Sequence, residues 1–137
     1  KDHTPKTESA KLGIAIVKKT LEIIDIMQPA YFVIENPRGK LRKLGLIDPK
    51  FHGRSNVRQT VWYCQYGDIR AKPTDIWTNI YQWKPRPLCF NGNKDCHHQP
   101  APRGSRTGTQ GLANSYEKSK IPEELCLEIL KTLGDKK

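Results

Sequence analysis

Apolar residues recur at helical spacing near the start of the chain, and lysines and acidic residues occupy most of the positions between them. A period of about 3.6 residues is that of an amphipathic helix, so this stretch predicts a helix over residues 9–27. Thr7 or Ser9 is suited to cap its first turn, and Pro29 lies just beyond its last turn. The apolar positions are Leu12, Ile16, Leu21, Ile23, Ile24 and Met27.

A second helix is predicted close to the end of the chain. Leu125, Ile129 and Leu133 are spaced four residues apart, and this apolar stripe predicts a helix that ends at Gly134. The residues in front of the stripe suit a helix N-terminus. They are Ser119 as the cap or directly before it, Pro122 at an early position, and Glu123 and Glu124 in the first turn.

Three short runs between these helices are predicted strands. Residues 31–34 are continuously apolar, with β-branched and aromatic side chains, which is typical of a buried strand in a parallel sheet. The alternation over 59–66 and the strand-forming run 74–78 predict a β-hairpin with 67–73 as its turn. A helix, a short turn and a buried strand in succession form one step of an α/β layer fold, so we expect a partial, doubly wound α/β sheet.

Residues 79–118 are rich in proline and glycine, which predicts an irregular loop insertion without regular elements. A loop of this length in a compact chain needs a function or a cross-link. The length of 137 residues suits one domain. We therefore expect residues 1–137 to form a single domain with 79–118 as its loop-rich part.

The chain is strongly basic, with 24 Lys and Arg against 14 Asp and Glu and a formal net charge of +10. Such an excess favours a polyanion such as DNA as the partner, although a generally basic soluble protein has the same composition. No apolar run approaches the ~18 residues that span a membrane, and the four cysteines do not form a secreted disulfide framework. We expect a cytoplasmic protein, and the initial Lys1 suggests a part of a longer one.

Glu35 follows directly after the predicted strand 31–34, at the edge where open α/β sheets bind ligands. Ile34-Glu35-Asn36-Pro37 resembles the Glu-Asn-Val motif of DNA cytosine-5 methyltransferases, with proline in place of valine. Residues 66–77 resemble the family's Tyr-Gly turn and Gln-x-Arg-x-Arg motif. Of the two arginine positions in that motif, only the one occupied by Lys72 is still basic. Residues 120–125 resemble the Val-Pro start of the family's final helix.

These matches follow the family's order, and 79–118 falls where the family inserts its target-recognition region. The chain therefore resembles the C-terminal part of a methyltransferase of the kind common in phages and prophages, which implies a Rossmann-like, S-adenosylmethionine-dependent fold. In this family a cysteine thiolate attacks C6 of a flipped-out cytosine, and C5 then takes a methyl group from S-adenosylmethionine.

The resemblance also implies roles for individual residues. Glu35 would hydrogen-bond N3 of the base, Asn36 would support its loop, and Lys72 would hold the catalytic loop or a phosphate. Ser119 and Ile121 would contact the cofactor. The expected DNA contacts are Arg38, Lys40, Arg42, Arg70, Arg103 and Arg106.

Two family features lie before the glutamate and have no counterpart before Glu35: the glycine-rich cofactor loop and the Pro-Cys nucleophile loop. We therefore expect activity only with an N-terminal half of about 100 residues, in the same chain or another. Alone, the chain should dimerise or be poorly soluble, because the open edge of its sheet is free to pair. Cys64-Gln65 matches the nucleophile loop in part, but we interpret Cys64 as a buried structural cysteine.

Cys89, Cys96 and His98 lie within ten residues of one another. Thiolate and imidazole are the preferred ligands of zinc, and Cys64 or His52 could complete a set of four. A structural metal would hold the irregular loop in place, and reduced thiols without a metal are the alternative.

Three functions remain open on these observations. The first is part of a cytosine-5 methyltransferase. The second is a module without catalysis, either a basic DNA-binding remnant or a binding module that zinc stabilises. The third is a basic α/β protein whose motif matches arise by chance.

Overall fold

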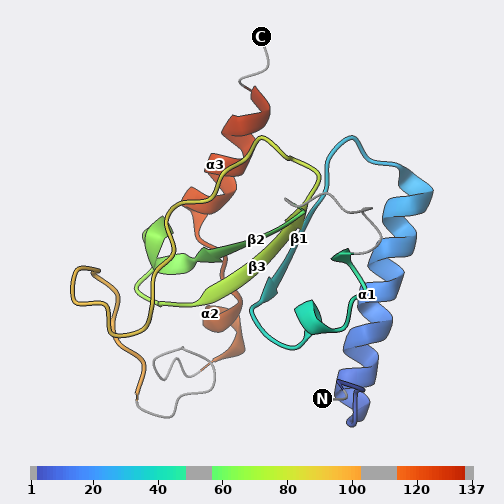
Figure 1. Ribbon diagram of the computed structural model, residues 1–137, viewed down its shortest axis with the longest axis horizontal. Coiled ribbons are helices and arrows are strands. Elements are labelled where there is room, and N and C mark those ends of the chain that lie inside the picture. The colour runs from blue at the N-terminus through green and yellow to red at the C-terminus, as the bar shows by residue number, and fades with distance from the viewer. Residues whose placement is uncertain (1–2, 49–56, 103–113, 135–137) are drawn as a thin grey trace.

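Helices lie on both faces of a small β-sheet in the computed structural model (Figure 1). The structure describes residues 3–48, 57–102 and 114–134. Within these ranges the expected α/β class is confirmed. In chain order, with η for a 3₁₀ helix, the elements are α1 (Glu8–Met27), β1 (Val33–Pro37), η1 (Leu41–Lys43), β2 (Arg58–Trp62), η3 (Tyr63–Tyr66), β3 (Pro73–Thr78), α2 (Ser115–Ser119) and α3 (Glu123–Gly134).

Both predicted helices form, and the ends of α1 follow from its capping residues. The Thr7 hydroxyl accepts a 3.1 Å hydrogen bond from the Ala10 N–H, which satisfies a donor that the first turn cannot pair. At the other end Gln28 adopts a left-handed φ of 45°, ahead of Pro29, and its N–H bonds to Ile24 O.

The sheet is antiparallel, so the prediction of a parallel sheet is wrong for the described strands. The strand order is β1-β3-β2, and β3 pairs antiparallel with both neighbours. The run 31–34 is predicted as a buried strand, but β1 begins only at Val33 and lies at the edge of the sheet, where Tyr31 and Val33 are exposed. The predicted hairpin is confirmed as β2 and β3, although β2 ends at Trp62 and the expected continuation of the strand is η3.

Two apolar cores lie on opposite faces of the sheet. Ile76 and Trp77 are neighbours in β3 but belong to different cores, because successive strand side chains point to opposite faces. The core on the α3 side contains Val61, Tyr63, Tyr66, Ile76, Ile80, Trp83, Leu125 and Ile129. The core on the α1 side contains Leu21, Ile47, Val57 and Trp77.

The segment 79–102 runs without a helix or strand, as predicted, apart from one isolated bridge between Arg70 and Gln99. Its first part is fixed to α3 by Glu128, whose carboxylate accepts hydrogen bonds from Trp83 Nε1 at 3.1 Å and Arg86 Nε at 2.8 Å. The short helix α2 lies inside 79–118, so the prediction of a wholly irregular stretch is wrong there. Ser119 ends α2 and lies before α3 without capping it.

Candidate functional site

Glu35 lies within β1, opposite Ile76 of β3, and not after the strand as predicted. It therefore faces the α3 side of the sheet, where the Tyr63 hydroxyl donates a 2.8 Å hydrogen bond to Glu35 Oε1. Burial and the Glu35 carboxylate raise the pKa of Tyr63, so the phenol keeps its proton and remains a donor. Tyr63 is fully buried and Glu35 is half-buried. The hydrogen bond therefore fixes Oε1 of a carboxylate that is still partly exposed to solvent.

Lys72 contacts the same tyrosine. Its ammonium lies 4.9 Å from the centre of the Tyr63 ring and donates to Lys118 O at 3.1 Å. Burial lowers the pKa of Lys72, and the Glu35 carboxylate opposes that shift. The structure thus brings together two of the three predicted catalytic residues, Glu35 and Lys72, around Tyr63.

Asn36, the third predicted catalytic residue, points to the other face of the sheet. It lies opposite Asp75 of β3 and, with Lys40 and Val17, lines a hollow under the first turns of α1. Its side-chain amide donates to Pro37 O at 2.7 Å. Asn36 therefore hydrogen-bonds locally at the end of β1, and its side chain lines the hollow on the face of the sheet opposite Glu35.

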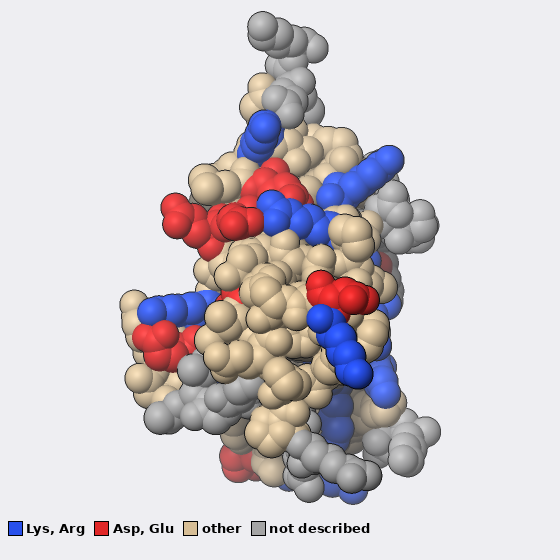
Figure 2. All heavy atoms as spheres, turned by 90° about the vertical axis from the view of Figure 1, so that its left-hand side faces the viewer, with Lys and Arg blue, Asp and Glu red and all other residues tan. Residues whose placement is uncertain are grey.

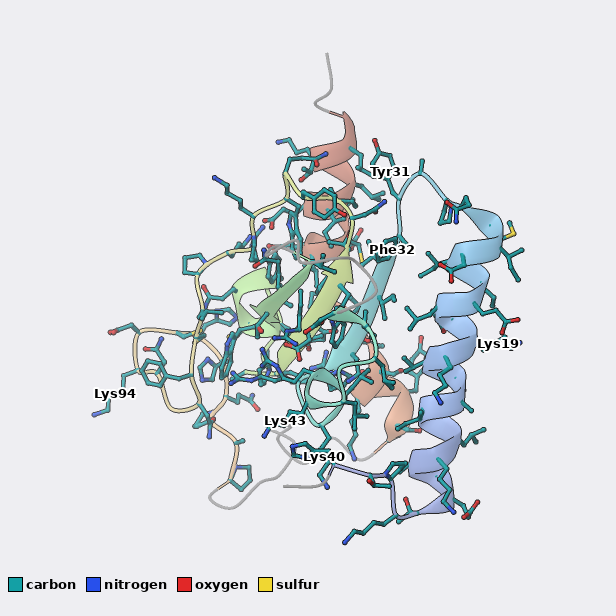
Figure 3. The ribbon with its side chains drawn as sticks, turned by 45° about the vertical axis from the view of Figure 1, so that its right-hand side comes forward. Lys19, Tyr31, Phe32, Lys40, Lys43 and Lys94 are labelled. Carbon is teal, nitrogen blue, oxygen red and sulfur yellow. The ribbon has the colours of Figure 1, made fainter. Side chains whose placement is uncertain are left out.

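Five cationic side chains surround an open hollow that begins where β1 ends. Figure 3 shows Lys40 and Lys43 on the segment after β1, at the end of the molecule opposite Tyr31. Among the described residues no ion pair involves Arg38, Lys40 or Lys43, and all three are exposed. The residues of this basic hollow are Arg38, Lys40, Arg42, Lys43 and Arg58, three of them predicted DNA contacts.

Two members of the basic hollow are held by acidic partners. Arg42 Nε lies 3.5 Å from the buried Asp75 carboxylate, and Arg58 pairs with Asp48. Figure 2 shows a different side of the molecule, where the 79–102 segment lies, and there acidic and basic groups are interspersed on a mainly uncharged surface. The basic hollow, by contrast, gathers cationic side chains around one depression and is therefore suited to a polyanion.

Arg70, a predicted DNA contact, is buried, with 3 % of its surface exposed. It pairs with Asp68, and a phosphate could reach it only if its present bonds opened. The other predicted contacts, Arg103 and Arg106, lie outside the described residues. The remaining donors of Arg70 bond to the carbonyl oxygens of Glu117, Lys118 and Lys120, at 3.0, 3.1 and 3.0 Å.

Ser119 and Ile121, the predicted cofactor contacts, do not converge on one pocket. The Ser119 hydroxyl donates to Tyr116 O at 2.8 Å. Ile121 is half-exposed and lines an open hollow with Arg70 and four acidic residues. These two residues alone therefore form no enclosed site for an adenosine group. The acidic residues of the hollow are Asp68, Glu117, Glu123 and Glu124.

Three sulfur atoms and one imidazole nitrogen converge where η3 meets the 79–102 segment. The ligand atoms of Cys64, Cys89, Cys96 and His98, which we call the Cys/His cluster, all lie within 4.8 Å of one another. Cys89 Sγ and His98 Nδ1 are 3.8 Å apart. The cluster could hold a metal ion. It contains all three predicted metal ligands and takes Cys64 as the fourth residue, while His52 lies outside the described ranges.

The thiols of the cluster are reduced, and Cys64, Cys89 and His98 are buried. Burial raises the pKa of Cys64 to about 12, and the neighbouring thiols of Cys89 and Cys96 add to this shift. Cys64 therefore keeps its proton unless a cation displaces it. The interpretation of Cys64 as a buried structural cysteine agrees with this environment.

The outer face of α1 is apolar although it is exposed. The strand beside it, β1, is at the edge of the sheet, and Val33 is half-exposed. Within the described residues no strand pairs with the outer edge of β1. The exposed apolar residues of α1 are Leu12, Ile16, Ile23, Ile26 and Met27, with 51–71 % of their surface accessible.

Comparisons of the chain with protein-family models, with curated proteins and with solved structures gave no match. A function for this chain is therefore inferred from its own residues and their geometry. None of the helices in the described ranges combines the length and the apolar composition needed to cross a membrane.

Sequence reasoning missed two residues that organise the site, Tyr63 and Asp68. The sequence pattern gives Tyr63 only as one position of an alternating strand. A buried tyrosine needs a partner for its hydroxyl, and that partner is Glu35. Asp68 precedes Arg70 by two residues, a spacing that lets the two side chains pair within a turn. The Asp68–Arg70 spacing is a local signal in the sequence, whereas the pairing of Tyr63 with Glu35 spans 28 positions.

Proposed function

We propose that this chain is the C-terminal part of a DNA cytosine-5 methyltransferase, which transfers a methyl group from S-adenosylmethionine to cytosine in DNA. The observation that carries the proposal is the Glu35–Tyr63 hydrogen bond, close in the chain to the basic hollow. Phosphate contacts fix the register of a protein on DNA, and an adjacent polar group can then read a single extruded base.

In this proposal Glu35 acts on the flipped cytosine. The Tyr63 hydroxyl occupies Oε1, which leaves the second carboxyl oxygen for N3 of the base. A hydrogen bond at N3 stabilises the charge that develops on the ring when a thiolate adds to C6. Lys72 lies against the ring of Tyr63 and so helps to hold the phenol that orients the Glu35 carboxyl group.

The rest of the chemistry belongs to an N-terminal half. That half supplies the thiolate, and bound S-adenosylmethionine supplies the methyl group. The exposed apolar face of α1 and the unpaired outer edge of β1 support this division, because an added strand and helix would cover both. Ser119 and Ile121 would then complete a cofactor site built mainly by the other half.

The test is reconstitution of methyl transfer. The chain would be produced with the protein segment encoded directly upstream of it, and incorporation of radiolabelled methyl groups into DNA would be measured. We expect incorporation with the wild-type chain and loss with Glu35→Gln. Glutamine still accepts the Tyr63 hydrogen bond, but unlike a carboxyl group it cannot share a proton with N3 of the base. Glu22→Gln, at an exposed position of α1, should retain activity. Full activity of the Glu35→Gln chain would refute the role of Glu35.

A second candidate function is a DNA-binding module without catalysis that zinc stabilises. The Cys/His cluster favours it, because such a module needs a cross-link for its irregular segment and no cofactor site. In this case the chain alone binds DNA with strong salt dependence, and no upstream segment confers methyl transfer.

A further inference from the structure

We propose that the Cys/His cluster is a structural zinc site in which Cys64, Cys89, Cys96 and His98 are the four ligands of one Zn²⁺ ion. The proposal stands on the geometry of the cluster. It does not depend on the proposed methyltransferase function.

The distances suit a single tetrahedral ion. Zinc binds thiolate sulfur at about 2.3 Å and imidazole nitrogen at about 2.0–2.1 Å, which places tetrahedral ligand atoms roughly 3.5–3.8 Å apart. Cys89 Sγ and His98 Nδ1 are 3.8 Å apart, and all four ligand atoms lie within 4.8 Å of one another. Small side-chain movements would therefore close the cluster around the ion.

The backbone explains how ligands from one short segment converge. Gly92 has a φ of 82°, and the Asn93 N–H bonds to Phe90 O at 3.2 Å, so the chain reverses between Cys89 and Cys96. His98 comes two residues after Cys96 and is the histidine that joins the cluster. The adjacent histidine does not join, because His97 is exposed and its Nε2 contacts Asp68 O at 3.1 Å.

Side-chain amides surround the sulfur atoms. Gln65 Nε2 lies 3.9 Å from Cys64 Sγ and 3.8 Å from Cys96 Sγ, and Asn93 Nδ2 lies 3.5 Å from Cys89 Sγ. Three thiolates around a divalent ion carry a net negative charge, and N–H groups directed at the sulfurs offset it. The amides of Gln65 and Asn93 are therefore placed to donate the hydrogen bonds that thiolate ligands of a metal require.

The burial of His98 is otherwise unexplained. Within the described part of the chain, its Nε2 has no hydrogen-bond partner, and its Nδ1 contacts only a thiol. A buried polar group without a partner is costly, so the position of this imidazole calls for a ligand. A metal bound through Nδ1 would supply one for that nitrogen, whose present partner is a thiol, and would leave Nε2 as the N–H donor of the ring.

The ligand set selects the metal and its role. Three thiolates and one imidazole in a tetrahedron are typical of zinc, whereas an iron–sulfur cluster would hold its ligand sulfurs farther apart. Four protein ligands leave no open position for water or substrate, which is the pattern of structural sites. The ion would cross-link η3 to the 79–102 segment, which otherwise contacts the hairpin turn through bonds such as Gln99 N–H to Ile69 O at 2.9 Å.

The test uses the full chain, expressed and purified with a thiol reductant. Elemental analysis should find about one zinc ion per chain. X-ray absorption at the zinc edge should show three sulfur atoms at about 2.3 Å and one nitrogen at about 2.0–2.1 Å. Replacement of zinc by Co²⁺ should give the visible bands of a tetrahedral thiolate site.

Matched variants identify the ligands. Cys64→Ser and His98→Ala should each lose most of the bound zinc, whereas Cys126→Ser, at an exposed cysteine of α3, and His97→Gln should retain about one ion. Unchanged zinc content in Cys64→Ser or His98→Ala would overturn the ligand set.

The spectrum of the wild-type chain decides the question even if a ligand variant fails to fold. A wild-type chain that neither retains zinc nor takes it up would overturn the proposal. A stable disulfide between two of the cluster cysteines, found under the same reducing conditions, would also overturn it.

Discussion

The hydroxyl of Tyr63 lies 2.8 Å from Oε1 of Glu35 and joins β1 to η3 across 28 positions of the sequence. Glu35 thereby has one oxygen held by a buried phenol. The carboxyl group is oriented before any ligand arrives, and an oriented group loses less entropy when it binds.

Tyr63→Phe should disturb both stability and function. It removes the donor to Glu35, and we expect a loss of about 0.5–1.5 kcal/mol in the free energy of unfolding. In the reconstituted enzyme we expect kcat to fall by about tenfold, because the carboxylate is no longer fixed. Urea unfolding and methyl transfer would be compared with Tyr116→Phe, an exposed tyrosine of α2. If both variants showed the same unfolding free energy and the same kcat, Tyr63 would have no orienting role.

Lys40→Gln and Lys43→Gln should weaken DNA binding in a way that depends on salt. If each lysine contacts a phosphate of duplex DNA, each variant should reduce the slope of log Kobs against log salt concentration by about 0.9. The control is Lys19→Gln on α1, whose ammonium pairs with Glu22. A similar change in all three variants would indicate that only the net charge matters.

The Asp68–Arg70 pair predicts a loss of stability in acid. Burial alone would raise the pKa of Asp68, but the hydrogen bonds and charge of Arg70 outweigh it and lower the pKa below 3.8. The unfolded chain then binds the proton more tightly, so the stabilisation is complete above the unfolded pKa and is lost as pH falls through the folded pKa. The difference in unfolding free energy between wild type and Asp68→Asn should be constant near neutrality and shrink below about pH 4. A difference independent of pH would contradict this account.

Glu128→Ala should destabilise the chain more than Glu124→Ala. Glu128 accepts hydrogen bonds from Tyr66, Trp83 and Arg86, so its removal leaves partly buried donors unpaired, at a cost of about 1–3 kcal/mol. Glu124 forms one exposed ion pair with Arg86, worth roughly 0–1 kcal/mol. Thermal unfolding would rank the two variants, and the reverse order would show that Glu128 does not anchor the loop.

The local elements could be predicted from the sequence, but their pairing could not. Both long helices and the hairpin follow from periodicity and turn residues, which act over short distances. The antiparallel pairing of β1 with β3 depends on residues about forty positions apart, for which periodicity holds no information.

The same distinction applies to the candidate site. The predicted ligands Cys89, Cys96 and His98 lie together because they share one short segment. Arg70 is an expected DNA contact, yet Asp68 and three backbone carbonyls compensate its charge inside the chain.

The alternation of side chains in β1 places Glu35 on the α3 side and Asn36 on the α1 side. A deletion or insertion of a single residue before Glu35 would shift the register by one and exchange the two faces. The carboxylate would then point under α1, away from Tyr63. Divergent versions of this chain should therefore keep the length of β1, whereas changes of length should accumulate in segments outside the sheet.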